Sequence, residues 1–171
     1  VIEQFAYADT WKNGTVSYLQ MIVPRLILMR ELLSEQGSIY VHIDWHVGHY
    51  VKVIMDEIFG KENFRNEIIW YYSNKMSRSS KNFPKAKDNL LFYTKTKENL
   101  FNEQKESREE PVKQSIRVWK DKKNMRARDE QGNVIYELSY DKTVNDIWGI
   151  PFIASTSQER LDFQTQKPEA L

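Results

Sequence analysis

All three histidines of the chain lie within one stretch of eight residues, which they share with an aspartate: His42, Asp44, His46 and His49. Imidazole and carboxylate groups are zinc ligands, so this stretch could form a metal site and make the protein a zinc hydrolase. The spacing argues against that. The first two side chains fall on one face of an expected strand and the last two on one face of the helix after it, so only an inward-folded turn could join them.

A structural role explains Asp44 more simply. It stands where a helix is expected to begin, and its carboxylate would accept N–H hydrogen bonds from the first helical turn as an N-cap. We therefore expect no metal at the histidines. Ligands bind at the carboxyl ends of strands in α/β sheets, however, so His42 and Asp44 are still candidates for a substrate pocket.

Five segments of regular structure are predicted around this stretch. Ser17 and Gln20 have the spacing of a capping box, Pro24 should kink the helix that they open, and Gly60 should end the next one. The strand–helix–strand order is typical of an α/β fold. In chain order, the expected elements are a helix over residues 17–36, a strand over 38–43, a helix over 46–59, and strands over 67–72 and 89–96.

The amino-acid composition excludes few classes of function. The chain has 171 residues, enough for one domain with a core, and its 25 basic and 24 acidic residues give no overall signature of nucleic acid or membrane. The absence of cysteine excludes disulfides and thiolate metal sites and fits a reducing, cytoplasmic setting. Arg25 and Arg30 interrupt the most apolar run, which predicts a buried helix rather than a membrane span. Both ends look cut, so we expect a fragment.

Two segments stand out by their charge. Residues 73–87 lie between two expected strands and hold five basic and no acidic side chains, which suit either a solvated loop or contacts to DNA phosphates. Residues 97–131 are highly charged, and Gly132-Asn133 just after them predicts a hairpin turn. The basic side chains of the first segment are Lys75, Arg78, Lys81, Lys85 and Lys87.

Three segments, taken together and in order, resemble the beta class of site-specific DNA amino-methyltransferases, which includes the modification subunits of type III restriction systems. They are YLQMIVPRLILMRELLSEQGSIYVHIDWHVGHYVKVIMDEIFGKENFRNEIIWYY, then FPKAKDNLLFYTK, then QERLDFQTQKPEAL. The resemblance implies part of a Rossmann-like, S-adenosylmethionine-dependent methyltransferase sheet, completed by an antiparallel strand pair. It also implies that residues 1–96 and 151–171 belong to the catalytic domain and that residues 97–150 are a target-recognition insertion.

The family's catalytic Asp-Pro-Pro-Tyr/Phe motif and its Phe-x-Gly-x-Gly cofactor loop do not occur in the sequence. The chain by itself is therefore expected to be inactive, as a piece of a larger enzyme. The resemblance implies adenine N6 as the methylated atom, with cytosine N4 as the alternative. Double-stranded DNA is the implied partner, with a restriction subunit and a second copy of the chain as further candidates. A non-catalytic DNA-binding module is the competing interpretation, and a metal hydrolase is a more distant one.

Specific residues follow from the same resemblance. Thr165, Gln166, Lys167 and Pro168 match the motif that lies along the cofactor, although a plain helix N-terminus beginning at Pro168 would also explain them. Trp119 and Trp148 lie in the variable region and are candidates for DNA contact, whereas the aromatic residues on the expected strands are more simply explained as core.

Overall fold

The computed structural model describes residues 14–171, except 76–77, 79, 121, 162 and 164. The chain forms two compact units, one made of residues 1–100 and 146–171 and the other of residues 101–145. The first unit is mixed α/β, as the strand–helix–strand order predicts, and the second is built from β-ribbons. No helix in the described part of the chain is long and apolar enough to cross a membrane.

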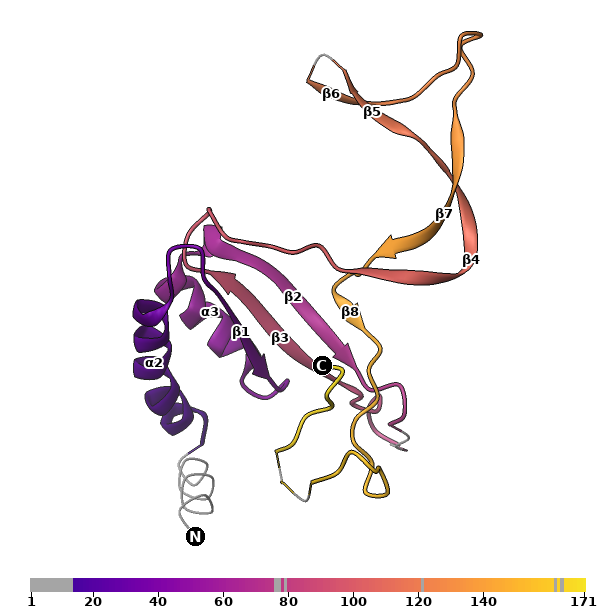
Figure 1. Cartoon of the computed structure of the whole chain (residues 1–171). Helices are drawn as coiled ribbons and strands as arrows, with labels where there is room; N and C mark the ends of the chain where they lie inside the picture. Colours follow the sequence, from indigo (N-terminus) through magenta and orange to yellow (C-terminus); the bar gives the residue numbers. More distant parts are fainter. Residues whose placement is uncertain (1–13, 76–77, 79, 121, 162, 164) are drawn as a thin grey trace. The chain divides into compact units, whose positions relative to one another are not determined.

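The first unit is centred on a four-stranded sheet with the order β1-β3-β2-β8 (Figure 1). Its central strand β3 runs antiparallel to both β1 and β2, and the short β8 lies parallel to β2. The strands expected near residues 67–72 and 89–96 were predicted to form an antiparallel pair, and this prediction is confirmed. The strands are β1 (Ser38–Ile43), β2 (Phe64–Tyr71), β3 (Lys87–Thr94) and β8 (Ile147–Trp148).

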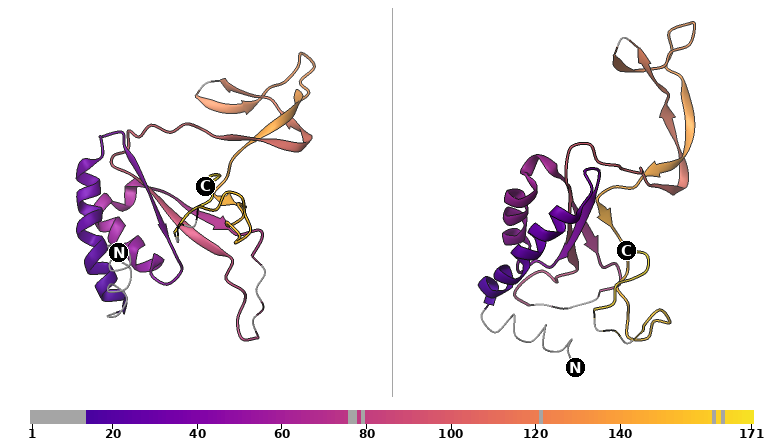
Figure 2. Two further views of the ribbon diagram at one scale, coloured as in Figure 1. Left: turned by 60° about the horizontal axis from the view of Figure 1, so that its bottom comes forward. Right: turned by 60° about the vertical axis from the view of Figure 1, so that its left-hand side comes forward.

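Both faces of the sheet are covered. Helices α2 (Gly14–Leu32) and α3 (Gly48–Phe59) lie on one face, as the two views of Figure 2 also show. Leu91 and Tyr93 of β3 point into the core beneath them. Because side chains alternate along a strand, Leu90 and Phe92 point to the opposite face, where they pack with residues that include Trp148 and Ile150. This double burial explains the uninterrupted run of large apolar side chains over residues 90–93 of β3.

The two helices differ from the prediction at their ends. α2 begins at Gly14 and ends at Leu32, so Ser17 is inside the helix and its hydroxyl donates to the Gly14 carbonyl at 2.9 Å. The capping-box interpretation of Ser17 is therefore wrong. α3 begins at Gly48, two residues later than predicted, and ends before Gly60 as expected. Its N-cap residue is Val47, which provides no side-chain cap, so Asp44 does not cap this helix.

The second unit consists of two antiparallel ribbons in succession. The long strands β4 (Lys105–Ser115) and β7 (Tyr136–Thr143) pair with each other, as do β5 (Arg117–Lys120) and β6 (Lys123–Arg126). The turn predicted at Gly132-Asn133 is present: Gly132 has a φ of 87°, and the Asp129 carboxylate accepts hydrogen bonds from the Gln131 and Asn133 amides at 3.0 and 2.8 Å. None of the described residues of this unit is buried.

Candidate functional site

A cluster of polar and aromatic side chains gathers at one end of the first unit's sheet. His42 of β1 and Asp88 of β3 meet there, with 2.8 Å between the His42 Nε2 and the Asp88 Oδ2. Both side chains are largely buried, at 25 and 18% exposed. The His42 ring also lies against the indole of Trp70 on β2, with 5.4 Å between ring centroids. Three neighbouring strands therefore each contribute one side chain to the cluster.

Two further residues, Tyr72 and Lys167, interact electrostatically with this cluster. Burial opposes the ionisation of Asp88, but hydrogen bonds from His42 and Tyr72 and the charges of His42 and Lys167 outweigh it, so the pKa of Asp88 is lowered. Burial raises the pKa of the Tyr72 hydroxyl, and the hydrogen bond to Asp88 and the negative charges of Asp88 and Asp44 raise it further. At neutral pH the cluster therefore holds an ionised carboxylate beside a protonated phenol.

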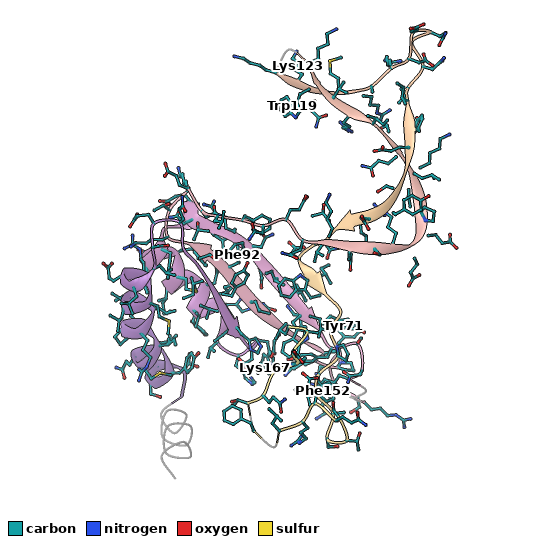
Figure 3. All side chains as sticks on the ribbon, in the orientation of Figure 1. Tyr71, Phe92, Trp119, Lys123, Phe152 and Lys167 are labelled. Carbon is teal, nitrogen blue, oxygen red and sulfur yellow. The ribbon has the colours of Figure 1, made fainter. Side chains whose placement is uncertain are left out.

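Lys167 belongs to the segment that matches the cofactor-side motif. Its Nζ lies 5.9 Å from the ring centroid of Trp70, and Figure 3 shows it at the same end of the sheet as Tyr71 and Phe152. Lys167 itself is exposed, whereas Pro168 is buried and Thr165 and Gln166 are half-buried. The structure thus brings the charge of Lys167 close to Asp88, which is far from it in sequence.

Gln166 stabilises the loop that precedes Lys167 in the sequence. Its side-chain amide donates to the Glu159 carbonyl at 2.7 Å, and its Oε1 accepts from the Leu161 amide at 2.8 Å. The helix expected to open at Pro168 is seen only as a single turn, closed by a hydrogen bond of 3.1 Å from the Leu171 amide to the Pro168 carbonyl. Gln166 therefore has a structural role that its sequence position did not reveal.

The two residues of the expected substrate pocket, His42 and Asp44, have different hydrogen-bond partners. His42 pairs with Asp88, whereas Asp44 pairs with the His46 ring at 2.7 Å and accepts the His46 amide hydrogen at 3.0 Å. Asp44 thus closes the turn before α3, and it contributes to the cluster only through its charge near Tyr72. Among the residues that the structure describes, no three metal-ligating side chains come together.

The basic segment 73–87 adjoins an open groove of about 510 Å³ on the first unit. Three exposed aromatic rings line it, those of Trp45, Tyr71 and Phe83. The Lys85 ammonium sits 3.4 Å from the centroid of the Trp45 indole, a cation–π contact. Aromatic faces beside a cation suit a flat ring that carries a phosphate, so the lining of the groove has the chemistry to bind part of a nucleic acid.

The other predicted DNA-binding cations differ in how they are held. Lys75 lies over the Tyr72 ring at 5.3 Å, and Lys87 donates to the Asn89 side chain at 3.1 Å. Arg78 and Lys81 are exposed. The segment is anchored near its start by Asn74, whose side chain exchanges two hydrogen bonds with the backbone of Phe152 at 2.9 and 3.0 Å.

The two candidate tryptophans occupy different environments. Trp148 on β8 is half-buried, lies beside Trp70 in the sheet register and packs on the second core cluster. This packing accounts for the partial burial of the Trp148 side chain. Trp119 on β5 is 76% exposed, in the second unit. Sequence reasoning missed Asp88 and Tyr72, because neither forms a motif with His42 until the strands are paired.

The chain resembles several characterised proteins. It is 37% identical to the Type II methyltransferase M.EcaI of Enterobacter cloacae over 58% of this chain and 22% of that protein. It is 35% identical to the Type III restriction-modification enzyme EcoP15I Mod subunit of Escherichia coli, over 52% of this chain and 14% of the relative. The Type II methyltransferase M.KpnI of Klebsiella pneumoniae shares 32% identity over 46% of this chain and 19% of its own.

These alignments span less than a quarter of each relative. A family model matches more of the chain: the model described as DNA methylase matches residues 6–171, which cover nearly all of the first unit and the whole of the second. The match agrees with the segments by which the sequence resembles amino-methyltransferases. The chain therefore belongs to the DNA methylase family.

Proposed function

We propose that the chain is part of a site-specific DNA methyltransferase of a restriction-modification system, which transfers a methyl group from S-adenosylmethionine to adenine N6. The family match over residues 6–171 is the observation that carries this proposal. The relatives are named as type II methyltransferases and type III modification subunits. Cytosine N4 is the alternative target, because the residues that would separate the two bases are not in this sequence.

The open side of β1 supports the proposal that the sheet is part of a Rossmann-like fold. Strand β1 pairs with β3 on one side, and among the described residues no strand pairs with its other side. An open edge of this kind exposes backbone N–H and C=O groups and invites another strand. The resemblance implies the catalytic strand at this edge. The Asp-Pro-Pro-Tyr/Phe motif is absent from the sequence, so residues outside this chain would supply the groups that hold the target amine.

The polar cluster suits the cofactor end of such a site. S-adenosylmethionine supplies an electrophilic methyl on its sulfonium, and it also carries a carboxylate. Lys167 is exposed and its Nζ lies near the Trp70 ring, so its ammonium can hold a carboxylate there. Asp88 attracts Lys167 and is itself fixed by His42 and Tyr72. In this proposal the cluster orients Lys167, and its groups exchange no proton with the substrate.

The basic segment 73–87 would hold DNA beside the active centre. An enzyme that acts on a base must first take it out of the duplex, which costs a few kcal/mol that contacts to the flanking strand have to offset. In this proposal the exposed basic side chains of the segment, Lys81, Lys85 and Lys87 among them, bind phosphates, and the groove lined by Trp45 and Phe83 accepts a base. Residues 97–150 would provide target recognition.

Protein partners belong to the same proposal. The modification subunits among the relatives suggest a restriction subunit as partner. A second copy of the chain is the other candidate. The outer side of α2 exposes Ile27, Leu28 and Leu32, the last at 77%, and apolar exposure of this kind is common at protein contacts.

The test is methyl transfer by the full-length protein. It is incubated with duplex DNA and S-adenosylmethionine carrying a labelled methyl group, and the DNA is digested to nucleosides for mass spectrometry. We expect labelled N6-methyladenine, and none from residues 1–171 alone. Labelled N4-methylcytosine would move the target to cytosine. DNA binding without any transfer would favour the non-catalytic binding module.

A further inference from the structure

The hairpin formed by β5 and β6 is the most basic part of the second unit. Residues 117–128 hold six basic side chains and one acidic one, Asp121, whereas the unit as a whole is close to neutral. All eight residues of the two strands are exposed. Among the described residues, no carboxylate forms an ion pair with Arg117, Lys120 or Arg126. These cations are therefore available to an anionic partner.

The register divides the hairpin into two chemically different faces. Cross-strand partners share a face and successive residues alternate, so the pairs Arg117–Arg126 and Trp119–Asn124 lie on one face. We name this the arginine face. The pairs Val118–Met125 and Lys120–Lys123 lie on the other, which we name the lysine face. Figure 3 shows Trp119 and Lys123 on this hairpin.

The arginine face is costly for folding. Two guanidinium groups stand directly opposite each other, and like charges in that position destabilise a ribbon. Trp119 is 76% exposed on the same face. Nothing in the packing of the second unit requires these residues, since no described residue there is buried. A partner with negative charge and hydrogen-bond acceptors would offset the repulsion between the two guanidinium groups. The same partner would cover the exposed indole.

We infer that the β5–β6 hairpin enters the major groove of duplex DNA and reads base edges with its arginine face. This inference rests on the proposed function and goes beyond it to the residues that set sequence specificity. A two-stranded ribbon fits the width of the major groove. Arginine forks match the O6 and N7 acceptors of guanine, and the Asn124 amide matches adenine in the same way. Lys120 and Lys123 on the other face contact phosphates.

Three double variants of the full-length protein test the inference. Arg117→Lys/Arg126→Lys keeps both charges and removes the forked donors, because an ammonium binds as a point charge. Lys120→Ala/Lys123→Ala removes two charges from the lysine face of the same hairpin and serves as the matched control. Val118→Ala/Met125→Ala tests whether trimming the hairpin by itself has an effect. Circular dichroism and thermal melting establish that each variant is folded.

The sequence specificity of each variant is measured in two ways. Genomic DNA methylated by each variant is sequenced at single-molecule level to define the methylated motif, and duplexes are selected from a random pool by binding alone. The arginine variant should lose preference at one or two guanine positions, by on the order of ten- to hundredfold each, with its salt dependence unchanged. The lysine variant should keep the motif, and its slope of log affinity against log salt should shrink by about 1.8.

Other outcomes overturn the inference. An arginine variant with an unaltered motif would assign the hairpin to phosphate contact only, and a motif altered by the lysine variant alone would mean that the faces are exchanged. A wild-type motif without guanine would also contradict it. Failure of the proposed function is distinguishable from failure of this inference. In that case the wild-type protein transfers no methyl group, yet it selects a guanine-containing sequence that the arginine variant does not select. The hairpin then still reads DNA.

Discussion

The two units of this chain hold their folds in different ways. The first packs side chains on both faces of a sheet, and its strand β3 is buried from Asn89 to Thr94. The second has no buried residue among those described and relies on backbone pairing and on the turn that Asp129 organises. Two-stranded ribbons are only marginally stable alone. The first unit thus constrains its sequence tightly, while the second exposes most of its side chains to a partner.

The largest expected effect sharpens this contrast. Met55 is fully buried between α3 and the sheet, so Met55→Ala should lower the free energy of unfolding by about 2–5 kcal/mol. Leu138 on β7 is 56% exposed, and Leu138→Ala should change it by no more than about 0.5 kcal/mol. Urea unfolding followed by circular dichroism measures both. Equal losses would show that the second unit has a core of its own.

The polar cluster should make the first unit sensitive to Asp88. Asp88→Asn weakens the pair with His42 and leaves buried polar groups poorly matched, so we expect a loss of about 1–3 kcal/mol at neutral pH. The folded-state pKa of Asp88 is lowered, so its stabilisation is present above the ordinary carboxyl pKa and is lost as the pH falls through the lowered value.

Unfolding measured between pH 3 and pH 7 checks this sign. The gap between wild type and Asp88→Asn should narrow toward the acid end, and a gap that widens there would contradict the pairing. Asp129→Asn is the companion variant in the second unit. The pKa of Asp129 is also lowered, first by the backbone hydrogen bond from Asn133, but this carboxylate is exposed. Its loss should disturb only the 129–133 turn and leave the melting of the first unit unchanged.

A smaller effect is expected from the basic segment of the first unit. In the full-length protein, Lys81→Ala/Lys85→Ala/Lys87→Ala should weaken binding to all DNA sequences alike, because phosphate contacts carry no base information. The slope of log affinity against log salt should shrink by roughly 0.9 for each lost contact. Lys61→Ala is the control, since Lys61 precedes β2 and the basic segment follows its other end. An unchanged slope would assign the segment to solvent.

The smallest expected effect is that of metal removal. His42 and His46 each pair with a different carboxylate, Asp88 and Asp44, and the two pairs share no residue. Protein purified without chelator should therefore contain no stoichiometric zinc by elemental analysis. Its melting temperature should not change when a chelator is added. A bound equivalent of zinc, or a lower melting temperature with chelator, would revive a metal site at the histidines.

Local patterns determined much of what could be predicted. Apolar periodicity located both helices and the strands β1, β2 and β3, because burial of one or both faces leaves a regular trace in the sequence. Gly132-Asn133 located a hairpin turn, since a positive φ favours glycine. Helix ends were less predictable. Ser17 matched a capping spacing by chance, and Asp44 found a nearer partner in His46 than the first turn of α3.

By itself, the sequence determined the mixed α/β character of the first unit, the charge of the 73–87 segment and the resemblance to DNA methylases. Only the tertiary structure decided that His42 meets Asp88, that Lys167 lies beside Trp70, and that Arg117 stands opposite Arg126. The physical reason is register. A strand's own residues fix which of its side chains share a face, but the partner strand and its alignment fix which side chains meet, and those depend on the whole packed sheet.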